Sequence, residues 1–170
     1  GLLAAEESLK QGIANVVITT PRMMISDNWA KLAEKTFSPS VRIIQCWSEH
    51  DDWQNKALDR INSGKQSVFI FVNDSLWGEK GRTICRAMGE DWCLIVDEAH
   101  NWEAAQATEF MGKNSPTHRL GLSAQFADPS NPGNISTVLD YLTSGQNNHF
   151  LDELNLSDAI EQGFLREYAY

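Results

Sequence analysis

Residues 94–100 read Leu94-Ile95-Val96-Asp97-Glu98-Ala99-His100, an apolar run that leads directly into two carboxylates. A short continuous apolar run is typical of a strand that is buried on both faces of a parallel sheet. Ligands of such sheets bind beyond the carboxyl ends of the strands, where Asp97 and Glu98 would emerge. Adjacent carboxylates repel each other unless a cation lies beside them, and Mg²⁺ takes one or two carboxylates together with phosphate oxygens. The stretch therefore predicts an α/β fold with an acidic site at the sheet edge, although the two acids could equally cap the next helix.

The tetrapeptide at residues 97–100 also resembles motif II of the DEAH-box and related superfamily 2 helicases. The resemblance implies that Asp97 holds the Mg²⁺ of bound ATP, as a Walker B aspartate does, and that Glu98 positions or activates the attacking water. It assigns His100 to the coupling between nucleotide and nucleic acid.

The composition is that of one globular domain of 170 residues, with 42% hydrophobic and 22% charged residues. The net charge of −9 argues against a general DNA-coating surface, but phosphates can still be bound locally by backbone amides and helix N-termini. Cys46, Cys85 and Cys93 form no CxxC pair and lack zinc-like spacing with His100, so we expect reduced core thiols and a cytoplasmic protein. The sequence has neither a signal peptide nor a membrane-spanning run, and we expect no membrane partner.

Apolar strands alternate with amphipathic helices along the chain. The expected strands are 16–19, 41–46, 68–72, 93–96 and 119–122. The expected helices are 1–11, one beginning near Ser26, one around 53–61, 101–113, 136–142 and 156–165, with 78–91 as helix or loop and 128–134 as a loop. In the second helix we expect Ser26 or Asp27 as the cap, with Trp29, Leu32, Ala33 and Phe37 in the core. In helix 101–113 we expect Trp102, Ala105 and Phe110 in the core.

Polar turns follow two of the expected strands. Thr20-Pro21-Arg22, with Asn28-Trp29 one helix turn later, resembles motif Ia of superfamily 2 motors, and Asn73-Asp74-Ser75 is similar to motif Ib. The resemblance implies contacts to the nucleic-acid backbone by Thr20, Pro21, Arg22, Asn73 and Ser75. An Asn-Asp-Ser turn that caps a helix explains the second turn equally well.

The last expected strand leads into Ser123-Ala124-Gln125, which resembles motif III. In the family this segment couples the nucleotide state to the nucleic-acid site, which implies that role for Ser123 and Gln125. The usual third residue is Thr, so Gln125 departs from the pattern and Ser123 carries the stronger inference. Residues 156–165, followed by Tyr168 and Tyr170, resemble the end of the first motor domain in restriction-enzyme and repair-type proteins of the superfamily.

The Walker A loop of these motors, G-x-x-x-x-G-K followed by Ser or Thr, does not occur in the sequence. Gly64-Lys65 is not such a loop, because Asp59 stands where its first glycine should be and Gln66 follows the lysine. In the family the loop directly precedes the first helix, and this chain opens inside what resembles that helix. We therefore expect a fragment that begins after the loop, lacks the strand before it, and neither binds ATP tightly nor hydrolyses it alone. The resemblance places that missing strand beside the motif II strand.

The combined prediction is a RecA-like α/β domain over residues 1–170, with a parallel sheet, helices on both faces, and the Walker A strand and loop lacking. We expect Thr20, Asn73, Asp97 and Ser123 along one edge of that sheet. The implied protein is a superfamily 2 helicase or translocase that uses ATP and Mg²⁺, acts on DNA in preference to RNA, and works with a second RecA-like domain and a nuclease or methylase. The alternative is a degenerate RecA-like domain that serves as a binding or scaffolding module. The sequence before Gly1 would distinguish the two.

Overall fold

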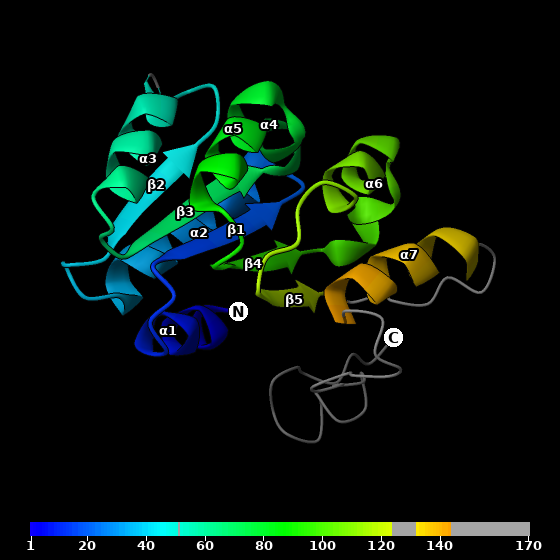
Figure 1. Cartoon of the computed structure of the whole chain (residues 1–170), viewed down its shortest axis with the longest axis horizontal. Coiled ribbons are helices and arrows are strands. Elements are labelled where there is room, and N and C mark those ends of the chain that lie inside the picture. Colours follow the sequence, from blue (N-terminus) through cyan, green and yellow to red (C-terminus); the bar gives the residue numbers. More distant parts are fainter. Residues whose placement is uncertain (51, 124–131, 144–170) are drawn as a thin grey trace, which may run out of the picture.

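The computed structural model describes residues 1–50, 52–123 and 132–143, with the side chains of 132–135 excepted. Its centre is a five-stranded, all-parallel sheet in the order β2-β3-β1-β4-β5 (Figure 1). The strands are β1 (Asn15–Thr20), β2 (Arg42–Cys46), β3 (Ser67–Val72), β4 (Trp92–Asp97) and β5 (His118–Leu122). The predicted parallel α/β sheet is confirmed, and the arrangement is consistent with a RecA-like fold.

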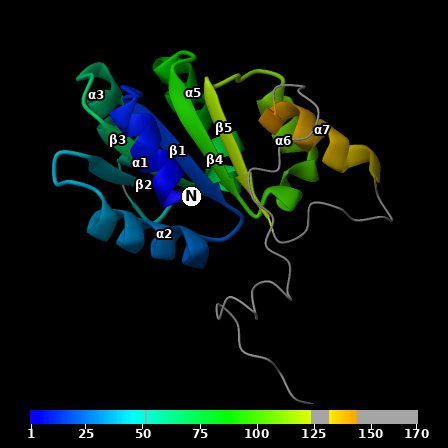
Figure 2. The same cartoon turned by 90° about the horizontal axis from the view of Figure 1, so that it is seen from below.

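Helices cover both faces of the sheet. One face carries α1 (Leu2–Lys10) and α2 (Met23–Thr36). The opposite face carries α3 (Trp53–Asn62), α4 (Asn73–Trp77), α5 (Glu79–Met88), the 3₁₀ helix η1 (Ala99–Glu103), α6 (Ala105–Met111) and α7 (Pro132–Thr143). Figure 2 shows α2 on the other side of the sheet from α3 and α5. No helix in the described part of the chain is long and apolar enough to cross a bilayer.

Two hydrophobic cores, one on each face, explain the continuous apolar runs of the central strands. Val16 and Ile18 pack toward α1 and α2, whereas Val17 between them packs into the opposite core. Successive side chains of a strand point to opposite faces, so a strand covered on both sides needs apolar residues at every position. Most of the buried aromatic residues, including Trp102 and Phe110, lie in the core opposite α1 and α2, whereas Trp47 lies in the core on the α1 and α2 face.

The second helix differs from its prediction. It begins at Met23, and Ser26 lies inside it, fully buried, rather than at its cap. The Ser26 hydroxyl is 2.8 Å from Thr20 Oγ1 and donates to the Phe71 carbonyl at 3.3 Å. Leu32 is 54% exposed, whereas Ala30 and Ala33 are fully buried. The prediction of the core face was wrong at Leu32 because small residues, not the largest apolar ones, face the sheet.

The helix expected over 101–113 is divided into η1 and α6. Ala104 between them is extended, with φ −65° and ψ 150°, so the helical register does not continue from Trp102. Trp102 and Phe110 are buried as predicted, but Ala105 is exposed and Ala107 takes the inward position. The prediction for Ala105 was wrong because it assumed one unbroken helix. The expected loop 128–134 overlaps α7 from Pro132 onward, and the helix expected at 156–165 lies outside the described residues.

The strand order also corrects an expectation about the missing strand. β4 pairs with β1 along one side and with β5 along the other. No further strand can therefore lie beside β4, and the prediction that one does was wrong. Among the described strands, β2 and β5 form the two edges of the sheet.

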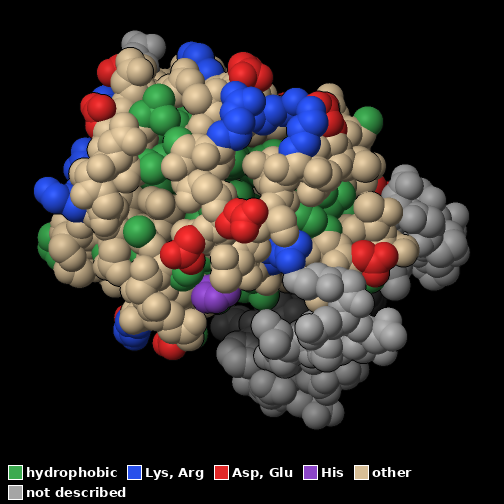
Figure 3. All heavy atoms as spheres, in the orientation of Figure 1, with side chains coloured by type: hydrophobic (Ala, Val, Ile, Leu, Met, Phe, Trp, Pro, Cys, Tyr) green, Lys and Arg blue, Asp and Glu red, His purple; other side chains and the backbone are tan. Residues whose placement is uncertain are grey.

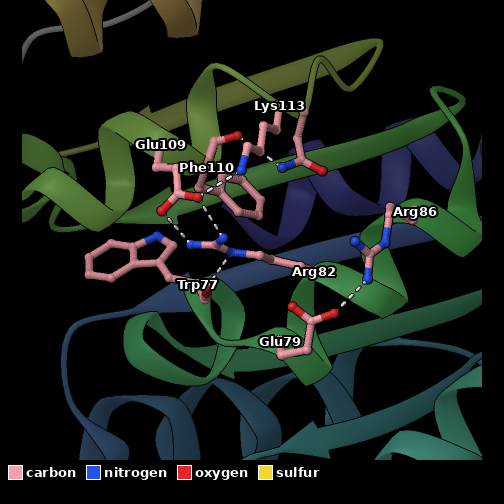
Figure 4. Close-up of polar contacts among 8 residues, drawn as sticks. Trp77, Glu79, Arg82, Arg86, Glu109, Phe110 and Lys113 are labelled. Atoms are coloured by element: carbon pink, nitrogen blue, oxygen red, sulfur yellow. Dashed lines mark hydrogen bonds and ion pairs between the residues drawn. The ribbon is translucent and has the colours of Figure 1, made fainter.

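A cluster of ion pairs joins α5 to α6 (Figure 4). Arg82 donates to both carboxylate oxygens of Glu109, at 2.8 and 2.9 Å, and its Nε donates to the Trp77 carbonyl at 2.6 Å. Lys113 donates to the same carboxylate at 2.7 Å. These contacts hold the pKa of Glu109 down, to about 2, chiefly through the hydrogen bonds from Arg82.

Candidate functional site

The polar residues predicted to share one edge of the sheet do so. Thr20 ends β1, Asn73 follows β3, Asp97 ends β4 and Ser123 follows β5. Because all five strands are parallel, these positions lie together at the carboxyl edge. That prediction is confirmed. The residues do not form one cluster, however. Asp97 bonds to Trp29 and Ser123 to His100, whereas Thr20 bonds to Ser26 and Asn73 to Thr19.

The Asp97 carboxylate is held from both sides by N–H donors. Its Oδ1 accepts from the backbone N–H of Glu98 at 3.1 Å, and its Oδ2 accepts from the indole N–H of Trp29 at 2.7 Å. Asp97 remains partly exposed. Each carboxylate oxygen has a second acceptor site, so Asp97 keeps the capacity to meet a cation or a water.

Glu98 has a backbone conformation that is rare for a residue with a side chain. Its φ is +52° and its ψ is +53°, in the left-handed region. This conformation turns the chain from β4 into η1 and costs on the order of 1–3 kcal/mol. The side chain is 38% exposed, and its Oε2 lies 3.4 Å from Nδ1 of His100. Backbone strain at an exposed carboxylate is common at functional sites.

His100 connects the turn after β4 to the end of β5. Its Nδ1 is 2.9 Å from the Ser123 hydroxyl, while its Nε2 is 3.1 Å from the Asn101 side-chain nitrogen. The amide nitrogen of Asn101 is a donor, so Nε2 accepts, and in the neutral ring the proton sits on Nδ1. His100 then donates to Ser123. His100 and Ser123, two of the three residues to which the resemblance assigned a coupling role, are thus in contact, whereas Gln125 lies outside the described residues.

The residues predicted to touch nucleic acid divide into buried and exposed ones. Thr20 is fully buried and bonds to Arg22 O and Ser26, and Asn73 is 4% exposed. The Asn73 side-chain oxygen accepts from Thr19 at 2.7 Å and from the Trp102 indole at 3.4 Å. Neither Thr20 nor Asn73 offers side-chain surface to a ligand, because internal hydrogen bonds occupy both.

The remaining members of that set reach the surface. Arg22 is exposed, and Pro21 and Ser75 are partly exposed. Asn73 to Ser75 form the first turn of α4 rather than an open turn. Contact with nucleic acid at this edge stays a prediction, and the exposed Arg22 is its best-placed side chain.

The start of α1 also lies at this site, which sequence reasoning did not predict. Gly1, the N-cap residue of α1, lies near Asp97. A Cβ on Gly1 would meet the Trp29 ring at 2.2 Å and a Leu122 methyl at 3.1 Å. The N-terminal end of a nine-residue helix therefore lies at the carboxyl edge beside Asp97. Helix N-termini attract anions through their free amides and their dipole.

The donor set decides which kind of metal ion fits. In the described residues no group of three or more His, Cys, Asp or Glu side chains is arranged to hold a metal ion. Asp97 supplies one or two hard oxygen ligands. That set fits Mg²⁺ when phosphate oxygens and water complete its coordination.

Sequence reasoning placed Trp29 in the core and within the motif Ia resemblance, but it missed the contact of Trp29 with Asp97. A half-buried tryptophan usually finds a partner for its N–H, which is a general signal but does not name the partner. Comparison of the sequence with models of known protein families and with curated proteins finds no match.

Proposed function

We propose that this chain is the first RecA-like domain of a superfamily 2 helicase or translocase, which couples ATP hydrolysis to movement along nucleic acid. The observation that carries the proposal is the arrangement at the ends of β4 and β5. There Asp97, Glu98 and the hydrogen-bonded pair of His100 and Ser123 lie at the carboxyl edge, beside the N-terminus of α1.

Each residue has a role that follows from its position. When bound, ATP would supply the transferable phosphoryl group and Mg²⁺ would polarise it. Asp97, oriented by its two N–H donors, offers oxygen ligands to the metal. The exposed Glu98 carboxylate aligns a water and accepts its proton. Through its hydrogen bond to Ser123, His100 transmits a conformational change of the turn after β4 to the end of β5. Gln125 belongs to the same coupling segment in this proposal.

The intact protein, in this proposal, carries a phosphate loop immediately before Gly1. Support comes from the place of the α1 N-terminus, since a loop leading into it would present backbone amides and a lysine beside Asp97. A strand before that loop would join the sheet at a free edge, because β4 is paired on both sides.

Nucleic acid would bind at the same edge of the sheet, through Arg22 and the turns at Thr20-Pro21-Arg22 and Asn73–Ser75. Figure 3 shows acidic and basic side chains interspersed on one face of the molecule, so local phosphate contacts suit this chain better than a broad basic surface. DNA is proposed over RNA because the resemblance is to restriction-enzyme and repair-type motors. A second RecA-like domain, a nuclease or methylase partner, and a cytoplasmic location complete the proposal.

Replacing Glu98 by Gln in the full-length protein tests the chemistry. Gln keeps the size and hydrogen bonding of Glu98 but cannot accept the proton. ATP binding should stay nearly intact, while turnover should fall roughly a hundredfold or more, the scale of lost general-base help. Glu103→Gln, at the far end of the same 3₁₀ helix, is the matched control and should keep its turnover. Unchanged turnover in E98Q would rule out the assignment.

One observation favours the alternative, a binding or scaffolding module. Both site carboxylates already have partners within the chain: Asp97 accepts from Trp29, and Glu98 lies beside His100. A domain of this kind would keep its site intact without nucleotide. Absence of Mg²⁺-dependent ATP binding by the full-length protein would favour this module over the motor.

A further inference from the structure

We propose that Trp29 is a positioning residue for Asp97, and that it ties the metal-binding carboxylate to α2 and so to the nucleic-acid side of the domain. This inference rests on the proposed function. It adds a direct connection between the motif II segment and the motif Ia segment that neither resemblance implies.

The bond between Trp29 and Asp97 is unlike the other tryptophan contacts. Its length of 2.7 Å is typical of a hydrogen bond in which the acceptor is charged. All six tryptophans lie in the described residues, and only Trp29 donates to a carboxylate. Trp92 donates to the Gly89 carbonyl and Trp102 to the Asn73 side chain, while Trp47 and Trp77 have no hydrogen-bond partner at Nε1.

The two donors together set the orientation of the carboxylate. Glu98 N–H holds Oδ1 and Trp29 N–H holds Oδ2, so rotation about the last side-chain bond of Asp97 would break both bonds. A ligand carboxylate that is oriented before the cation arrives loses less freedom on binding it. Removing such an outer partner typically costs 10–100-fold in metal affinity or activity.

Helix α2 carries this contact to the other half of the site. Arg22 is its N-cap residue, and Trp29 lies two turns further on, roughly 10 Å along the helix axis. The Ser26 hydroxyl between them bonds to Thr20 and to the Phe71 carbonyl, which fixes this part of α2 to the ends of β1 and β3. A phosphate bound at Arg22 would therefore act on the same rigid segment that holds Asp97. Nucleic acid should change the affinity for Mg²⁺ with ATP, and Trp29 should be required for that effect.

The test uses Trp29→Phe and Trp47→Phe in the full-length protein. Both variants lose an indole ring, but Trp47 is 2% exposed and its Nε1 has no partner, so W47F loses no hydrogen bond. Calorimetric titration with ATP, in Mg²⁺ and then in EDTA, separates the metal-dependent part of the affinity. In W29F that part should fall roughly 10–100-fold, with the affinity in EDTA unchanged. W47F should change neither. Single-stranded or duplex DNA should shift the Mg²⁺-dependent affinity in the wild type and in W47F, but not in W29F.

The outcomes separate this inference from the function on which it rests. If the wild type binds no ATP, the proposed function fails and the inference fails with it. If the wild type binds ATP but W29F behaves like W47F, the motor assignment stands and the role of Trp29 is refuted. If DNA shifts the affinity in W29F as much as in the wild type, the connection through α2 is refuted.

A spectroscopic measurement keeps the proposal testable should W29F not fold. In ¹⁵N-tryptophan-labelled full-length protein, Asp97→Asn should move the Trp29 indole resonance, because a charged acceptor is replaced by a neutral one. The Trp92 indole, bonded to a backbone carbonyl, is the internal reference and should stay in place. An unmoved Trp29 resonance would mean that the bond to Asp97 does not exist in solution.

Discussion

Glu98 combines a strained backbone with the carboxylate on which the proposed chemistry depends. Its φ of +52° is a conformation that glycine adopts without a steric cost. Glu98→Gly should therefore raise the free energy of unfolding by up to about 1 kcal/mol, less than the full strain because glycine also gains freedom in the unfolded chain. The same variant should lose ATP turnover. Denaturant unfolding and an ATPase assay on the full-length protein measure the two effects.

Asp52 is the matched control for that experiment. It is the other non-glycine residue with positive φ in the described part of the chain, at +60°, and it lies away from the site at the start of α3. Asp52→Gly should relieve similar strain and leave turnover unchanged. A destabilised E98G protein would show that the turn after β4 is not strained.

At this scale the sequence predicted the residues of the acidic motif but not their partners. Asp97, Glu98 and His100 are contiguous, so their shared location follows from the chain itself. The bond from Trp29 joins residues 68 positions apart, and nothing in the local pattern around Trp29 names its acceptor. Asn73 is the reverse case, since a polar residue after a strand suggested a ligand contact, whereas its side chain is buried and bonded to Thr19 and Trp102.

Arg22 is the N-cap residue of α2, where its side chain can reach a phosphate without reading a base. Arg22→Ala in the full-length protein should weaken nucleic-acid binding equally for all sequences. It should also lower the slope of log affinity against log salt concentration by about one. Lys35→Ala, an exposed residue in the last turn of the same helix, should leave binding unchanged. Filter binding at several salt concentrations on unrelated sequences measures both. A loss confined to some sequences would indicate base readout and contradict the proposal.

The ion-pair cluster between α5 and α6 should make stability depend on acidity. Arg82 and Lys113 lower the pKa of Glu109 from its ordinary 4.5 to about 2. A lowered carboxyl pKa stabilises the folded state at all pH values above 4.5, and the stabilisation is lost as pH falls from 4.5 toward 2. Glu109→Gln should flatten the pH dependence of stability in that window, as measured by urea unfolding. Arg82→Lys, which keeps the charge but not the two-pronged contact, should flatten it in part. An unchanged slope in E109Q would show that the pair contributes nothing.

Element types were easier to predict than element faces and breaks. The strands were found because the sheet buries both of their sides and so demands continuous apolar runs. The inward face of α2 was misjudged at Leu32 because close packing on the sheet selects Ala30 and Ala33. The break between η1 and α6 at Ala104 contains no glycine or proline that would have predicted it.

The order of strands in the whole sheet is the part of the fold that local patterns do not contain. β1 pairs with β3 and β4, which are distant in sequence, and β4 is closed on both sides. The family resemblance implied that the strand before the Walker A loop lies beside β4. That prediction was wrong because β1 and β5 already occupy both sides of β4.

The chain of residues 1–170 should not bind Mg²⁺ with ATP at micromolar concentration by itself. Asp97 offers one or two oxygen ligands, and the sequence has no Walker A loop to hold the phosphates. Calorimetric titration of this chain beside the full-length protein measures the difference. Micromolar binding by the shorter chain would show that its phosphate site lies among the residues described above.

The central position of β1 has a consequence for biosynthesis. β1 leaves the ribosome before both of its neighbours in the sheet, because β3 and β4 are completed roughly 50 and 75 residues later. At 5–20 residues per second, the nascent chain carries this apolar strand with at least one edge unpaired for roughly 4 to 15 seconds. During that interval the sheet cannot form completely, because its central strand is made before the strands on either side of it. Chaperones that shield hydrophobic segments on the ribosome should therefore matter more for this protein than for one built from neighbouring hairpins.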